Sequence, residues 1–165
     1  MLIYGLLQTP AYAAALLVNN LRVAAVDVER VVKLRMERQK RLTDDDPLIF
    51  RAVIEEAALD RLVGGVDVIR DQYVHLLTLA ERDNITLHLM PTSVAVHDGL
   101  DGEFILLDFH EARSIGYVEF PDGAVYVQNH DQVAASTLAA ERLCAAALSP
   151  ADTIKAIKSR LAKLT

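Results

Sequence analysis

Four strand-like segments between Asn84 and Gln128 constrain the fold more than any other feature of this chain. The residues before and after them show the three-to-four-residue apolar spacing of helices almost throughout. A cluster of strands flanked by helices predicts an α+β fold. The four segments are Ile85–Met90, Glu103–Phe109, Ile115–Phe120 and Ala124–Gln128.

A fifth strand is predicted earlier in the chain, at Leu48–Ile54. This run is apolar nearly throughout, which indicates a strand covered on both faces. Two helical segments, Glu55–Leu62 and Val66–Arg82, separate it from the strand that begins at Ile85. Strand, helices and strand in this order predict a βαβ crossover, so the first two strands should be parallel neighbours.

The last three strands are short and closely connected. Pro121, Asp122 and Gly123 supply turn residues for a hairpin, which predicts an antiparallel meander. The crossover and the meander together predict one mixed five-stranded sheet packed by helices. We expect a single domain over residues 1–165, since no linker or repeat interrupts the chain.

Four further helices are predicted outside the strand region. Ser149, with Pro150 and Asp152 behind it, is a strong start signal for the last of them. The helix at Gln132–Leu148 is rich in alanine, which permits close helix–helix contact and makes a homodimer plausible. The other two helices span about Thr9–Leu21 and Asp27–Leu42.

Composition limits the cellular setting and the chemistry. No apolar run approaches the ~20 residues of a membrane span, and the first residues lack the features of a secretion signal. A single cysteine among 165 residues cannot form an internal disulfide. These features predict a cytoplasmic protein without membrane contact, and no pattern calls for a cofactor.

Charge is distributed unevenly. The segment Glu29–Arg41 carries +4, whereas the whole chain carries −6. This basic helix could contact nucleic acid, or it could be a solvated face or a docking surface for an acidic partner. The second interpretation is favoured, because the cations surround the helix and no aromatic residues interleave with them. The basic surface candidates are Arg30, Lys33, Arg35, Arg38 and Arg41.

The loop from His97 to Glu103 is the densest set of candidate site residues. Its histidine and carboxylates could ligate a divalent metal. The spacing does not fit a calcium loop, and zinc would need more histidine or cysteine nearby. A polar connection with glycines at positive φ, or a loop that binds a ligand without metal, fits better. The candidates are His97, Asp98, Asp101 and Glu103.

A second candidate is the acidic pair Glu55 and Glu56, where the first strand ends. The carboxyl end of a parallel strand often faces a binding crevice, and an acid pair could transfer protons. Acids in a first helical turn are also favoured by the helix dipole, which is the simpler explanation. No catalytic or metal-binding constellation emerges, so we do not predict an enzyme. The alternative is a small enzyme or metal-dependent site that uses these acids and the His97–Glu103 carboxylates.

Several sequence blocks, taken in order, resemble a known family. They are Gly5–Tyr12, Arg35–Gln39, Ile54–Arg61, Gln72–Leu79 and His97–Phe104. The chain is similar to the C-terminal effector domain of actinobacterial XRE-type helix-turn-helix regulators, the WhiJ-like or antitoxin-like regulators.

The resemblance implies a transcription-regulating domain that acts with other components. Its DNA-binding head would precede this domain, so DNA would be bound only through a segment that this chain lacks. No helix-turn-helix stands before Gly5, and Tyr4 occupies a position where the family usually has proline. The resemblance also implies a small partner protein and a dimer as the working form. The alternative to a partner protein is a small-molecule effector.

Overall fold

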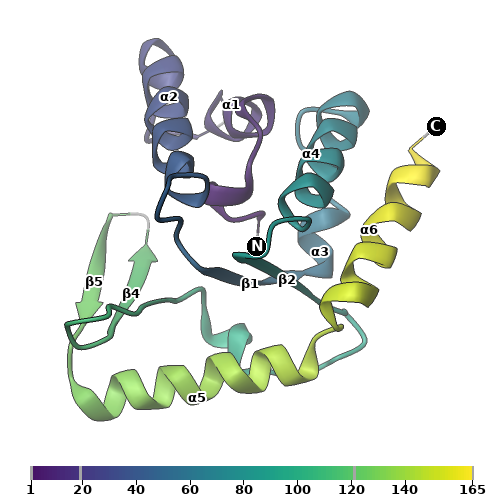
Figure 1. Cartoon of the computed structure of the whole chain (residues 1–165). Coiled ribbons are helices and arrows are strands. Elements are labelled where there is room, and N and C mark those ends of the chain that lie inside the picture. The colour runs from purple at the N-terminus through teal and green to yellow at the C-terminus, as the bar shows by residue number, and fades with distance from the viewer. Residues whose placement is uncertain (1, 19, 121, 165) are drawn as a thin grey trace. The chain divides into compact units, whose positions relative to one another are not determined.

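The computed structural model describes residues 2–18, 20–120 and 122–164, with helices and strands that confirm the α+β class (Figure 1). These residues form two compact units. Unit 1 comprises Met1–Thr92 and Leu148–Thr165, and unit 2 comprises Ser93–Ala147.

Unit 1 contains the predicted crossover. Strands β1 (Phe50–Glu55) and β2 (Ile85–Met90) pair in parallel over six residues. The connection between them runs through α3 (Glu56–Leu59) and α4 (Val66–Leu79). The apolar stripe of α4 is buried in the unit's core, where Ile69 and Leu76 are fully enclosed. Both the strand direction and the connecting helices are therefore confirmed.

The remaining elements of unit 1 are helical. Ser149 starts the last helix as predicted, because its Oγ accepts a hydrogen bond from the Asp152 amide at 3.1 Å. The longer helices are α1 (Pro10–Val18), α2 (Val28–Gln39) and α6 (Pro150–Lys163). Three short 3₁₀ turns accompany them: η1 (Gly5–Leu7), η2 (Ala25–Asp27) and η3 (Lys40–Leu42).

A buried glutamine joins the N-terminal segment to α4. The Gln72 side chain is fully buried. Its Oε1 accepts a hydrogen bond from the Thr9 amide at 2.7 Å, and its Nε2 donates to the Leu7 carbonyl, also at 2.7 Å. One side chain thus satisfies two backbone groups at the entrance to α1, where a helix start has unpaired amides.

Unit 2 contains the predicted antiparallel meander. Its strand order is β3-β4-β5, with β4 in the centre. The strands are β3 (Ile105–Leu107), β4 (Ile115–Phe120) and β5 (Gly123–Val127). The 3₁₀ turn η4 (Asp98–Asp101) precedes them, and the long helix α5 (His130–Ala146) follows.

The single five-stranded sheet was not found, because the strands form a two-stranded and a three-stranded sheet. The backbone of Leu89 in β2 explains why that strand pairs only with β1 in the described part of the chain. The Leu89 carbonyl accepts from the Leu148 amide at 2.8 Å, and the Leu89 amide donates to Thr153 Oγ1 at 2.9 Å. The chain entering α6 therefore occupies the edge where a third strand would bind.

Two strand predictions also need correction. In β1 only Ile54 is buried and Arg51 is exposed, so this strand is not covered on both faces. Strand β3 is shorter than predicted, and Glu103 and Asp108 lie outside it. Asp108 is exposed, so its carboxylate is solvated and does not need a partner inside the sheet.

Two adjacent glycines, Gly64 and Gly65, precede α4 and provide a matched test of the packing of this turn against α1. Both have positive φ, +74° at Gly64 and +93° at Gly65, so alanine is strained at either position. A Cβ at Gly64 would lie 2.9 Å from the Ala15 Cβ, whereas a Cβ at Gly65 meets nothing within 4 Å. We expect Gly64→Ala to lower the free energy of unfolding by about 1–2 kcal/mol more than Gly65→Ala, measured by urea unfolding. Equal losses would contradict this contact.

Candidate functional site

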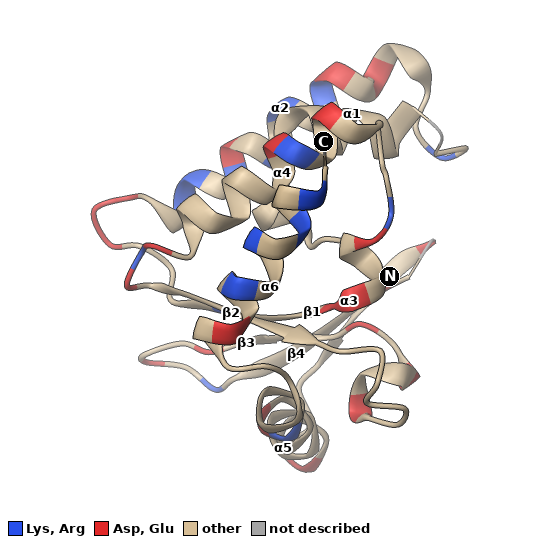
Figure 2. Cartoon of the chain, turned by 90° about the vertical axis from the view of Figure 1, so that its right-hand side faces the viewer, with Lys and Arg blue, Asp and Glu red and all other residues tan. Residues whose placement is uncertain are grey.

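Glu56 lies where the two parallel strands end, and it is held by a network of hydrogen bonds. The Thr92 amide and hydroxyl donate to its Oε2 at 2.8 and 3.1 Å. Arg160 of α6 contacts its Oε1 at 2.5 Å and also binds Asp60 at 3.0 Å. Figure 2 shows the acidic residues of α3 and the basic residues of α6. Glu56 therefore links α3, the end of β2 and α6.

This network favours the ionised form of the Glu56 carboxyl. The hydrogen bond from the Thr92 backbone, followed by the Arg160 interaction, lowers the pKa of the Glu56 carboxyl. A general base works best when its pKa lies near the operating pH. The lowered pKa of Glu56 lies further from neutral pH than that of a free glutamate, which disfavours acid–base catalysis by this residue. Glu55, the last residue of β1, is partly buried beside it. The geometry assigns Glu56 a structural role.

The pH dependence of stability tests this role. Because the folded-state pKa is lowered, the stabilisation by Glu56 is complete above its unfolded pKa of about 4.3 and is lost as the pH falls through the folded value. Glu56→Gln should cost about 1–3 kcal/mol of unfolding free energy at pH 7. The difference from wild type should shrink below about pH 4. Asp60→Asn, at a more exposed carboxylate, is the control and should lower the free energy of unfolding by less. A loss of unfolding free energy in Glu56→Gln that is unchanged at pH 3 would contradict the structural role.

The His97–Glu103 loop is organised by its own hydrogen bonds and by α5. His97 Nδ1 accepts from the Gly99 amide at 3.2 Å and caps η4. Asp98 forms an ion pair with Arg142 of α5 at 3.0 Å. Gly102 has φ +135°, as expected for a connection that needs glycine. Asp101 is exposed in the same turn. These contacts fit a folded connection between unit 2 elements.

Glu103 faces a different environment from the rest of its loop. It lines a cavity of about 190 Å³ with Ile105, Tyr117 and Glu119. Desolvation, and then the Glu119 carboxylate, raises the pKa of Glu103, although the residue as a whole remains exposed. Sequence analysis missed the Glu103–Glu119 pair. The register of the meander predicts this pair. Ile105 pairs with Tyr117, and two residues beyond them along the strands Glu103 and Glu119 lie opposite each other.

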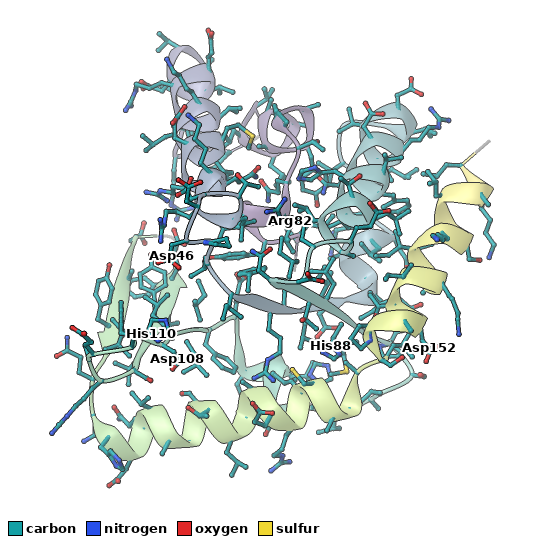
Figure 3. The ribbon with its side chains drawn as sticks, in the orientation of Figure 1. Asp46, Arg82, His88, Asp108, His110 and Asp152 are labelled. Atoms are coloured by element: carbon teal, nitrogen blue, oxygen red, sulfur yellow. The ribbon has the colours of Figure 1, made fainter. Side chains whose placement is uncertain are left out.

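Metal ligation needs several donors around one point. Among residues 2–18, 20–120 and 122–164, no three His, Cys, Asp or Glu side chains are grouped to hold a metal ion. Two of the polar side chains that Figure 3 labels, His88 and Asp152, contact other protein groups. His88 Nδ1 lies 3.0 Å from the Leu148 carbonyl oxygen, and Asp152 binds Lys155 at 2.9 Å.

Some basic residues of the Glu29–Arg41 segment are paired with nearby acids. Arg30 pairs with Asp27, and Arg41 pairs with Asp44, each at 3.0 Å. Arg35 points into the unit, where its Nη1 donates to the Gln8 side chain at 2.5 Å. Lys33 and Arg38 are exposed. Residues 27–46 contain as many acidic as basic side chains, so the local excess within Glu29–Arg41 does not extend over the surrounding surface.

An apolar groove between α1 and α2 is the main surface feature that sequence analysis missed. It has a volume of about 480 Å³, and Glu29 is its one charged lining residue. Helix α1 contains no charged residue at all, yet Val18 is 70 % exposed. The loop beyond α1 exposes Leu21 fully. The other lining residues are Pro10, Ala11, Ala14, Val18, Ala25, Val28 and Val32.

The absence of charge on α1 is physically informative. A helix that packs on a protein surface normally carries polar residues on its outer face, whereas an apolar helix is normally covered on all sides. In α1 the inner face, including Tyr12 and Ala13, is buried, and the outer face borders the groove. The uncharged run from Pro10 to Val18 was the available sequence signal. The position of α2 beside it could not be read from the sequence.

These observations define an α+β protein with a partly open apolar surface. The chain belongs to the DUF5753 family, a domain of unknown function whose model matches residues 1–159. No curated protein and no solved structure matched the chain. Among the described helices, none has both the length and the apolar character needed to span a membrane.

Proposed function

We propose that this chain is the cytoplasmic effector domain of a helix-turn-helix transcriptional regulator and that it binds a small partner protein in the α1–α2 groove. The partner's presence would control DNA binding by a head on a separate segment, as in an antitoxin-like pair. The ordered sequence blocks from Gly5 to Phe104 support the regulatory assignment. The uncovered apolar outer face of α1 carries the assignment of a binding surface.

The small size of the cavity beside Glu103 and the openness of the α1–α2 groove favour a protein partner over a small molecule. Ligand pockets usually occupy about 300–1,000 Å³ and enclose most of the ligand. The cavity beside Glu103 is smaller, at about 190 Å³. The α1–α2 groove is larger, at about 480 Å³, but it is an open channel between two helices. Such a channel fits the apolar face of a helix better than an enclosed metabolite.

The groove supplies the specificity that this proposal requires. Its walls are almost wholly apolar, so a partner must present an apolar face without buried charge. Glu29 at the margin favours a basic or hydrogen-bond-donating residue on that partner. The enzyme alternative lacks comparable support, because Glu56 is held by structural contacts.

Differential capture from the native host tests the proposal. Tagged wild type, Val18→Glu and Val74→Glu serve as baits; the two valines are both exposed, and Val74 lies on α4 away from the groove. We expect wild type and Val74→Glu to retain the same small protein and Val18→Glu to lose it. Equal recovery by all three baits, or recovery of no protein by wild type, would refute binding in the groove.

A further inference from the structure

The outer strand of the unit 2 sheet has an open edge. In the described part of the chain, β5 pairs with β4 alone (Figure 1). On its other side β4 pairs with β3. An unpaired strand edge presents backbone amides and carbonyls that can accept another strand. Proteins usually protect such an edge with charge, proline or a covering element.

None of these protective features is found in β5. Its residues are Gly123-Ala-Val-Tyr-Val127, with no charged side chain and no proline. Val125 is 49 % exposed and Tyr126 is 61 % exposed. Neighbouring Phe120 on β4 is also exposed, at 46 %, with its ring close to Gly123. The edge is therefore apolar, rich in residues that favour strands, and open to solvent.

We propose that β5 pairs with β5 of a second copy of this chain, in an antiparallel arrangement that joins the two three-stranded sheets. A two-fold axis requires the paired strands to be antiparallel and the contacting surface to complement itself. The β5 edge shares no residue with the α1–α2 groove, so this proposal does not depend on the proposed partner.

The order of side-chain sizes along β5 supports pairing with itself. The strand runs from small residues at Gly123 to large ones at Tyr126 and Val127. With Val125 on the two-fold axis, Tyr126 faces the small Ala124 of the second copy. Val127 likewise faces Gly123. Val125 faces its own copy on the axis, and the other two large side chains each lie opposite a small one.

Charge also permits this register. The residue before β5 is Asp122, which falls opposite the neutral Gln128 when Val125 lies on the axis. No like charges face each other across the strand pair, so electrostatic repulsion does not oppose it. A five-residue strand pair is small compared with the roughly 1,200–2,000 Å² of a specific interface, so we expect a dissociation constant on the order of 10–100 μM.

Site-directed cross-linking tests the register. In a Cys144→Ser background, Val125→Cys places two thiols across the axis at a strand-pair spacing compatible with a disulfide. We expect most of the protein to become a covalent dimer under mild oxidation at 100 μM, about ten-fold more than for Val118→Cys. Val118 is the matched control, because it faces the same side but lies on the central strand. Equal cross-linking of both variants, or none, would overturn the proposal.

Sedimentation equilibrium from about 5 to 500 μM gives an independent readout. Wild type and Val125→Thr should dimerise with similar constants, whereas Val125→Lys should weaken dimerisation at least ten-fold while keeping the circular dichroism of the wild type. A wild type that stays monomeric throughout, or a dimer that Val125→Lys does not weaken, would refute β5 pairing. The proposal would also fail if the protein stayed monomeric and β5 paired with a strand of a different protein.

Discussion

Replacing Gln72 with methionine should lower the free energy of unfolding by about 3 kcal/mol. Methionine nearly keeps the length of the side chain but removes both of its hydrogen bonds. The Thr9 amide and the Leu7 carbonyl would each lose a partner beside a fully buried side chain. Each unsatisfied buried group costs about 1–3 kcal/mol, so the two together outweigh any gain from a more apolar side chain.

Urea unfolding at pH 7 measures this loss, with Gln132→Met as the control. Gln132 is exposed in α5, and its replacement should change stability by less than about 0.5 kcal/mol. The midpoint should fall for Gln72→Met while the slope remains unchanged. If Gln72→Met loses less than about 1 kcal/mol, the bridge to the N-terminal segment does not stabilise the fold as described.

Replacing Ala14 with glutamate should weaken partner binding by at least about 100-fold, which corresponds to about 2.7 kcal/mol. Ala14 lines the groove from α1, so the new carboxylate would be desolvated against the apolar face of the partner. Ala134→Glu, at an exposed position of α5, is the matched control, since it adds the same charge to another helix. Calorimetric titration with the captured partner measures both, and thermal unfolding of the free variants confirms that they fold. Similar affinities for the two variants would place the partner elsewhere.

Much of the fold could be predicted because its signals are local. The apolar run ending at Ile54 and the helical spacing after Gly65 predict the parallel crossover. The turn residues before Ala124 predict the hairpin, and Ser149 predicts the start of α6. Each of these signals lies within a few residues of the structure that it specifies.

The division into two sheets could not be predicted in the same way. It depends on Leu148 and Thr153 occupying the backbone groups of Leu89, about sixty residues earlier in the chain. The sequence contains both partners but no pattern that connects them. The Glu103–Glu119 pair is an intermediate case, because the strand register specifies it once the meander is recognised.

The candidate site also combines features that the sequence signals with features that only the packing reveals. Charged residues attracted attention to Glu56 and to the His97–Glu103 loop, and the structure gives Glu56 and Asp98 ion-pair partners. The groove is built from alanine, valine and proline, which sequence analysis assigns to a core by default. Only the packing of α1 against α2 shows that these residues remain uncovered.

Amide hydrogen exchange of the protein with and without its captured partner tests the central claim most directly. Binding in the groove should slow exchange in α1 and in the first two turns of α2, from Val28 to Arg35, by at least ten-fold at saturating partner. Exchange in α4, whose Val74 lies outside the groove, should remain unchanged. Protection confined to other elements, with α1 exchanging as fast as in the free protein, would contradict the account.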